Sequence, residues 1–179
     1  KAKINDAGLS CPLWELFIAS EGLARKFAHR RKDGHVHIPD DRLEVSIKCN
    51  KRALSHALAE LIANALDFSP DDQEVEILYE QRGDRVVIQI TDQGTGIPAR
   101  HIDQAMRYFQ QINRDKQEQQ GMGLGLPLAA RIIELHAGTL HIDSDTDQGT
   151  RLLITLPVEK PSKPASGGGG LSRSMAVRA

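Results

Sequence analysis

The residues best suited to chemistry gather in three short clusters, and the first pairs a carboxylate with an amide. Glu60 and Asn64 are four positions apart in a segment with helical periodicity, so their side chains share one helix face, which Asp67 or Phe68 extends. An amide oxygen beside a carboxylate suits Mg²⁺, a hard ion that takes few protein oxygens and keeps phosphate and water ligands. Taken alone, the cluster is more typical of a solvated polar helix face.

The second cluster, Asp92-Gln-Gly94-Thr-Gly96-Ile97-Pro98, directly follows a predicted buried strand. Glycines at alternate positions allow the backbone to turn sharply or to approach a flat ligand closely. A carboxylate at the end of a strand can accept a hydrogen bond from such a ligand. A simple tight turn has the same composition, so this cluster by itself leaves both interpretations open.

The third cluster, Gly121-Met-Gly123-Leu124-Gly125-Leu126, opens a helix predicted to begin near Pro127. Glycines leave backbone N–H groups free to point at phosphate, and the helix N-terminus adds a favourable partial charge. The cluster lacks the Lys-Ser/Thr ending of a P-loop, and no strand of the Rossmann type immediately precedes it. It is therefore a weak phosphate-binding signal when read alone.

The elements that must position these clusters follow from hydrophobic periodicity and from turn residues. Asn50 is an N-cap candidate for the strongest predicted helix, and Gly138 is placed to end the last one. The expected elements are a helix over 12–30, a strand over 43–49, a helix from Asn50 to about Leu66, a hairpin of strands 75–79 and 86–91, a helix from about Pro127, and strands 139–144 and 150–156. This order predicts an α+β fold, a two-layer α/β sandwich whose mixed, largely antiparallel sheet carries about three helices on one face.

Length and composition predict one folded domain over residues 12–158, an N-terminal linker over 1–11, and a flexible Pro/Gly/Ser-rich tail over 159–179. The formal net charge of −1 argues against a nucleic-acid-binding surface. No apolar run approaches the ~18 residues needed to span a bilayer. Two cysteines form neither a disulfide framework nor a metal cluster, and a reducing cytoplasm is the expected setting.

Together the clusters resemble the ATP-binding catalytic domain of sensor histidine kinases, of the Bergerat type, in the wider group that includes DNA gyrase, Hsp90-type chaperones and mismatch-repair ATPases. The resemblance covers roughly Trp14 to Pro157. It rests on several ordered motifs, which are an N box at 60–69, a G1 box at 92–96, a weak F box around Phe109, a G2 box at 121–125, and a closing segment at 136–138 and 149–157.

The resemblance implies a Mg-ATP site in which Asn64 binds Mg²⁺, with Glu60 acting on it through water. Asp92 would accept the adenine amino hydrogen, and Thr150 would support that contact through water. Arg114 and Lys116, in a lid over 100–120, are phosphate partners or simply solvated loop charges. The other residues implied around ATP are Phe68, Gly94, Gly96, Ile97, Gly121, Gly123, Leu124, Gly125 and Leu126.

Two departures from the family pattern make the first cluster more acidic: many members have a second Asn at the position of Glu60 and a basic residue at that of Asp67. In relatives that phosphorylate serine or hydrolyse ATP, a Glu at the position of Glu60 acts as a general base. None of the seven histidines has the phosphoacceptor pattern of a following acidic residue, and His56 is interpreted as a helix-surface residue.

The expected function is therefore transfer of the γ-phosphoryl of Mg-ATP to a histidine on a helical, dimeric phosphoacceptor domain outside this chain. A response regulator would be an indirect partner, which receives the phosphoryl group from that domain. A Ser/Thr kinase or ATPase that uses Glu60 as base, and an ATP-binding regulatory module without transfer activity, remain alternatives.

Overall fold

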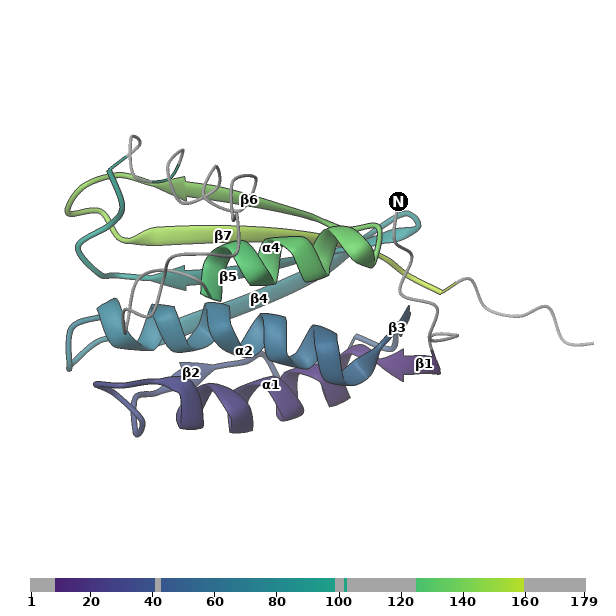
Figure 1. Ribbon diagram of the computed structural model, residues 1–179, viewed down its shortest axis with the longest axis horizontal. Helices are drawn as coiled ribbons and strands as arrows, with labels where there is room; N and C mark the ends of the chain where they lie inside the picture. The colour runs from purple at the N-terminus through teal and green to yellow at the C-terminus, as the bar shows by residue number, and fades with distance from the viewer. Residues whose placement is uncertain (1–8, 41–42, 99–101, 103–124, 160–179) are drawn as a thin grey trace, which may run out of the picture.

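A computed structural model describes residues 9–40, 43–98, 102 and 125–159 of the chain. Three helices, α1 (Leu13–Phe27), α2 (Lys51–Phe68) and α4 (Gly125–Leu135), lie side by side along a five-stranded sheet, with α2 in the middle (Figure 1). The sheet strands are β2 (Val36–His37), β4 (Val75–Arg82), β5 (Arg85–Asp92), β6 (Thr139–Ser144) and β7 (Thr150–Pro157). The two-layer α+β arrangement expected from the sequence is confirmed.

The sheet is mixed, with strand order β2-β4-β5-β7-β6. Only β2 runs parallel to its neighbour, β4, whereas the β4–β5, β5–β7 and β6–β7 pairs are antiparallel. The register places Asp92, the last residue of β5, opposite Thr150, the first of β7, and Thr150 also faces Ser144 at the end of β6. Three strand ends therefore meet at one end of the sheet.

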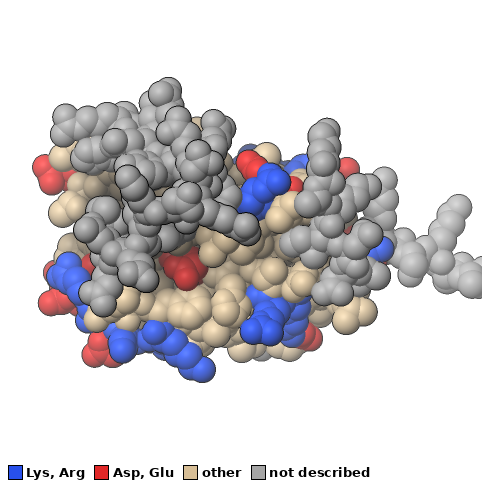
Figure 2. All heavy atoms as spheres, viewed as in Figure 1, with Lys and Arg blue, Asp and Glu red and all other residues tan. Residues whose placement is uncertain are grey.

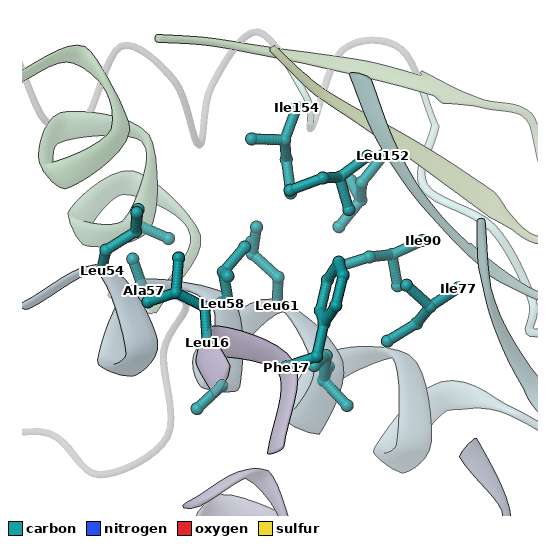
Figure 3. Close-up of a cluster of buried hydrophobic side chains, with 14 of the residues drawn as sticks. Leu16, Phe17, Leu54, Ala57, Leu58, Leu61, Ile77, Ile90, Leu152 and Ile154 are labelled. Atoms are coloured by element: carbon teal, nitrogen blue, oxygen red, sulfur yellow. The ribbon is translucent and has the colours of Figure 1, made fainter. Parts of the chain in front are cut away.

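The hydrophobic core lies between the helices and one face of the sheet, because the central strands alternate buried and partly exposed residues. Leu58 and Leu61 of α2 point toward Ile90 and Ile154 of the sheet (Figure 3). The opposite face of the sheet is covered by no helix among the described residues. Such one-sided burial is typical of an antiparallel sheet with one solvated face.

The strongest sequence prediction, the helix following Asn50, is confirmed. The side-chain oxygen of Asn50 accepts a hydrogen bond from the backbone N–H of Ala53 at 3.0 Å, which satisfies one of the free donors of the first turn. The helix continues to Phe68, two residues beyond the predicted end. The hairpin and the strands over 139–144 and 150–156 are also where the sequence predicts them.

Two strands were not predicted. β1 (Leu9–Pro12) pairs antiparallel with β3 (Ser46–Cys49) in a separate small sheet, so residues 9–11 are paired although they fall within the predicted linker. The two-residue β2 is too short to give an alternating pattern. The domain boundaries themselves stay a prediction.

Gly138 has a different role from the one expected. Ala137, with φ of 58°, is the left-handed residue after α4, whereas Gly138 donates its N–H to Ile133 O at 2.9 Å. A Cβ on Gly138 would lie 2.7 Å from both Thr155 O and a Leu156 methyl. The glycine therefore permits close contact between the end of α4 and β7.

Basic side chains on the face drawn in Figure 2 form several separate groups with acidic side chains among them, instead of one continuous field. This agrees with the net charge of −1.

A search of the described helices finds none with the length and apolar character to cross a bilayer.

Candidate functional site

Asp92 is the centre of the candidate site, at the end of β5. Only 7% of its surface is exposed. Its Oδ1 atom accepts two backbone hydrogen bonds, from Gly94 N at 2.9 Å and from Thr150 N at 3.1 Å. Both bonds use the same oxygen, and none is formed by Oδ2 among the described residues. One oxygen of this carboxylate thus fixes the loop, and the other forms no hydrogen bond within the described part of the chain.

The electrostatics of Asp92 reflect this position. Burial raises the pKa of its carboxyl above the ordinary 3.8, while the hydrogen bonds from Gly94 and Thr150 act in the opposite direction and only partly offset it. A buried carboxylate whose second oxygen lacks a protein donor gains from a ligand N–H.

Ser144, which was not predicted as a site residue, connects the end of β6 to the loop after β5 and to the start of β7 through its side chain. Its Oγ accepts a hydrogen bond from Ile97 N at 2.8 Å and donates to Gly149 O at 2.8 Å. It also lies 3.0 Å from Thr150 Oγ1. The signal that could have identified Ser144 is its place at the end of a predicted strand, directly before the turn that leads to Thr150.

Two glycines close the loops around Asp92. Gly96 and Gly149 have φ of 68° and 76°, in the region that favours glycine. A Cβ on Gly96 would collide with the backbone oxygen of Asp145, and one on Gly149 would collide with that of Asp92. These two glycines therefore allow two backbone segments to pass close to each other. That structural role is enough to explain why both are glycine, without a bound ligand.

Gly94 connects this end of the sheet to α2. A Cβ there would lie 2.5 Å from the backbone oxygen of Phe68, so the loop after β5 packs directly on the last residue of α2. The side chain of Phe68 is 63% exposed. Asn64 and Glu60, one and two turns earlier, are half-buried on the same helix.

Glu60 lies against the start of α4. An added Cβ on Gly125 would be 2.5 Å from Glu60 Oε2 and 3.4 Å from its Cδ, so the absence of a side chain at Gly125 makes room for this carboxylate. Proximity to a helix N-terminus is favourable for an anion. Leu126, the next residue, packs on the hydrophobic core. The α2 face of the first cluster and the helix end of the third cluster therefore meet.

Asp67 does not belong to this face, which corrects the expectation of a polar stripe that includes it. Its Oδ1 accepts hydrogen bonds from His29 N at 2.9 Å and Arg30 N at 2.8 Å, in the turn after α1. A residue three positions after Asn64 is rotated about 100° from the residue four positions after it, and here that difference directs the carboxylate to α1. Both of its carboxylate oxygens accept backbone hydrogen bonds in the turn after α1, which gives Asp67 a structural role there.

The far ends of α2 and α4 are joined by His136. Its Nδ1 lies 2.7 Å from Ile132 O, and its Nε2 accepts the Asn50 N–H at 3.1 Å. Donation from Nδ1 to that carbonyl leaves Nε2 as the acceptor. His56, interpreted from the sequence as a helix-surface residue, is half-buried and packs beside Phe27 with ring centroids 5.5 Å apart.

Several expected site residues lie outside the described residues: Phe109 of the F box, the lid residues Arg114 and Lys116, and the G2-box residues Gly121, Gly123 and Leu124. The site that can be described is thus bounded by α2, the start of α4 and the ends of β5, β6 and β7. No group of three or more His, Cys, Asp or Glu side chains in this part of the chain could hold a metal ion. A Mg²⁺ ion beside Asn64 would depend on phosphate and water oxygens for most of its ligands.

A hollow lined by His37, Glu74, Glu76, Thr91 and Gln93 lies elsewhere. Thr91 precedes Asp92 in β5, so its side chain points to the opposite, helix-free face of the sheet. This hollow is separate from the candidate site.

Comparison with known proteins gives one consistent relationship. Residues 49–160, more than half of the chain, match the family described as "Histidine kinase-, DNA gyrase B-, and HSP90-like ATPase". The alginate biosynthesis sensor protein KinB of Pseudomonas aeruginosa is 31% identical over 150 residues, covering 83% of this chain and 24% of the relative. The circadian input-output histidine kinase CikA of Synechococcus elongatus is 31% identical over 126 residues, covering 70% of this chain and 17% of the relative.

The fold is also found among solved structures. The mycobacterial sensor histidine kinase MprB superimposes with a TM-score of 0.66 at 24% identity, over 84% of this chain and 97% of that chain. The two curated relatives are much longer, since this chain spans only 24% and 17% of them.

Proposed function

Since the chain belongs to the histidine kinase-, DNA gyrase B- and HSP90-like ATPase family, we propose that it binds Mg-ATP and supplies the γ-phosphoryl group for transfer to a histidine on another domain. The adenine base would lie at the strand ends around Asp92. The phosphates would extend along α2 toward the start of α4, past Asn64 and Glu60. The glycines of 121–125 would approach the phosphates.

The observation that supports an adenine site most directly is the hydrogen bonding of Asp92. Its Oδ1 accepts hydrogen bonds from two backbone N–H groups, which hold the carboxylate in place, and no described residue donates a hydrogen bond to the second oxygen. An ionised carboxylate only accepts hydrogen bonds, and the adenine edge offers an amino group where guanine offers a carbonyl. The site therefore favours adenine.

The residues on α2 and α4 fit a hydrated Mg²⁺ ion held chiefly by phosphate. Asn64 supplies an uncharged oxygen, and Glu60 supplies a carboxylate one turn away that can orient metal-bound water. When bound, Mg²⁺ neutralises phosphate charge as the γ-phosphoryl group leaves. The α4 N-terminus adds fixed partial positive charge on the same side.

The transfer step needs positioning more than strong base catalysis. The acceptor imidazole would attack the γ-phosphorus in line, forming an N–P bond as the bond from phosphorus to the bridging oxygen breaks and ADP leaves, and its neutral nitrogen is already nucleophilic. The acceptor lies on a helical, dimeric domain of the longer protein, from which a response regulator would take the phosphoryl group. We place this domain in the cytoplasm, where ATP is available.

Glu60 favours one alternative. Its carboxylate adjoins the helix end where phosphates would lie, and a carboxylate so placed could deprotonate a serine hydroxyl or a water. A Ser/Thr kinase or an ATPase is therefore the second candidate function.

The test is transfer of ³²P from [γ-³²P]ATP to the acceptor domain of the same full-length protein. A phosphohistidine is lost in acid and survives base, whereas a phosphoserine survives acid. Acid-labile label supports the proposal. Acid-stable label, or release of inorganic phosphate without acceptor labelling, supports the alternative. Tight ATP binding without either product would leave only a regulatory module.

A further inference from the structure

The hydrogen-bond directions around Ser144 follow from its neighbours, because among the described residues Gly149 O is the one carbonyl oxygen within hydrogen-bond distance of its hydroxyl. Gly149 O is 2.8 Å from Ser144 Oγ and can only accept, so Ser144 must donate there. The Ile97 N–H, also at 2.8 Å, can only donate, so Ser144 accepts from it.

This assignment settles the direction of the third contact. Ser144 Oγ and Thr150 Oγ1 are 3.0 Å apart, a distance at which one hydroxyl donates to the other. Since the Ser144 hydrogen is already used by Gly149 O, the hydrogen of Thr150 must point to Ser144. Ser144 is then saturated with one donated and two accepted bonds, and Thr150 Oγ1 keeps only lone pairs for any further partner.

The same end of the sheet carries a second acceptor. Asp92 Oδ1 is held by Gly94 N and Thr150 N, and an ionised carboxylate has no hydrogen to donate. A ligand that reaches Asp92 Oδ2 and Thr150 Oγ1 therefore meets two acceptors. A water molecule that bridges Asp92 Oδ2 and Thr150 Oγ1 would donate one hydrogen to each. Such a water could therefore only accept a hydrogen bond from the ligand.

We propose that Ser144 is a specificity-determining positioning residue: by fixing the hydroxyl of Thr150 as an acceptor, it makes the pocket reject bases with a carbonyl at the adenine amino position. This inference rests on the proposed function, since it assumes that the base lies against Asp92 and Thr150. The proposal makes Ser144, on β6, a contributor to the selectivity for adenine that the proposed function attributes to the Asp92 carboxylate alone.

The test compares affinities for Mg-ATP and Mg-ITP, because inosine carries a carbonyl in place of the amino group of adenine. Inosine also has an N1–H where adenine has a lone pair, so the readout is the change in the ratio of affinities between variants. In Ser144→Ala the Thr150 hydroxyl can rotate and donate to that carbonyl. The ratio of ITP Kd to ATP Kd should therefore fall by about three- to tenfold, the range for one ordinary hydrogen bond. Ser144→Thr, which retains a hydroxyl, should keep the ratio within about twofold.

The control is a double-mutant cycle with Thr150→Val, which removes the hydroxyl at nearly constant shape. In that background Ser144→Ala should no longer change the ratio. If Ser144→Ala fails to fold, Ser144→Cys should lower the ratio in the same direction, because a thiol is a weak donor and acceptor.

The inference is wrong if Ser144→Ala weakens both nucleotides equally, which is the expected effect of a purely structural residue. It is also wrong if the ratio falls equally in the Thr150→Val background. Failure of the unaltered chain to bind ATP would instead contradict the proposed function. ATP binding with an unchanged ratio would contradict only the role of Ser144.

Discussion

Asp92 meets two demands with the two oxygens of one carboxylate. Oδ1 holds the loop after β5 against the start of β7, and Oδ2 is the oxygen proposed to accept a hydrogen bond from the ligand. Burial raises the pKa of the carboxyl, so the charged form is less favourable in the folded protein than in the unfolded chain. Function and stability therefore oppose each other at this residue.

Asp92→Asn tests this opposition, because the Asn oxygen can still accept both backbone hydrogen bonds. The folded protein binds the Asp92 proton more tightly than the unfolded chain does. The Asp92 contribution to stability therefore declines as the pH rises above 3.8 through the folded pKa. The stability of Asp92→Asn relative to the unaltered chain should thus be greater at pH 7.5 than at pH 4.5, by urea denaturation. The reverse order would show that the carboxylate stabilises the fold.

Substitutions of Asn64 and Glu60 should affect phosphoryl transfer differently, although the two residues share one helix face. Asn64→Ala should abolish most phosphoryl transfer, because Mg²⁺ loses its protein anchor. Glu60→Gln should retain measurable transfer if the nucleophile is an imidazole. A loss of about 10² to 10⁴ in rate for Glu60→Gln, measured with saturating Mg-ATP and acceptor, would instead identify a general base.

At the scale of elements, the sequence predicted the helices and strands that depend on local signals, such as a capping residue or a regular spacing of apolar residues. The Asn50 cap and the leucine period predicted α2, and alternation predicted the hairpin of β4 and β5. β1 was missed because its pairing with β3 is a long-range contact without a local signal. The direction of Asp67 depended on the packing of α1 against α2, which periodicity alone cannot resolve.

The candidate site shows the same division. The family resemblance predicted Asp92, Asn64 and Thr150 as site residues, which stays a prediction, and the structure adds Ser144, whose contact with Thr150 appears only when β6 is paired with β7. The glycine clusters proved to be of two kinds. Gly96 and Gly149 serve backbone crossings, whereas Gly125 leaves space for the Glu60 side chain.

Gly125→Ala should impair transfer more than folding. The added methyl would meet the end of the Glu60 side chain at 2.5 Å, and a flexible side chain can move away at little cost in stability. The carboxylate would then leave its position at the start of α4. The control is Gly22→Ala on α1, where an added Cβ would have no neighbouring atom within 4 Å. This variant should lower neither phosphoryl transfer nor thermal stability. Severe unfolding of Gly125→Ala would contradict this view.

Gly149→Ala should destabilise the fold more than Gly83→Ala does. Both glycines have positive φ, of 76° and 63°, so both substitutions incur backbone strain of about 1 kcal/mol or more. Only at Gly149 would the new Cβ also collide with a backbone oxygen, that of Asp92. Chemical denaturation of the two variants should therefore give clearly different midpoints. Equal losses would mean that the loop moves freely away from β5.

At the scale of the whole molecule, the described residues form one layer of helices on a five-stranded sheet, with a small two-stranded sheet beside it. The candidate site lies where one end of the larger sheet meets α2 and the start of α4. None of the seven histidines precedes an acidic residue, and the chain spans only a part of its longer relatives. The acceptor is therefore proposed to lie on another domain.

The chain by itself should bind Mg-ATP without labelling itself. Incubation with [γ-³²P]ATP should leave it unlabelled, and label should appear on the acceptor domain when that domain is added. Self-labelling of the chain alone, mapped to one of its own histidines, would overturn the assignment of the acceptor to a separate domain.

The central claim is that an adenine nucleotide binds against Asp92, and calorimetric titration with Mg-ATP of the unaltered chain and of Asp92→Asn tests it most directly. The predicted result is one ATP per chain, with binding weakened about ten- to a hundredfold in the variant, the worth of a charge-assisted hydrogen bond. Equal affinity of the two proteins for ATP, or no binding by either, would contradict the account.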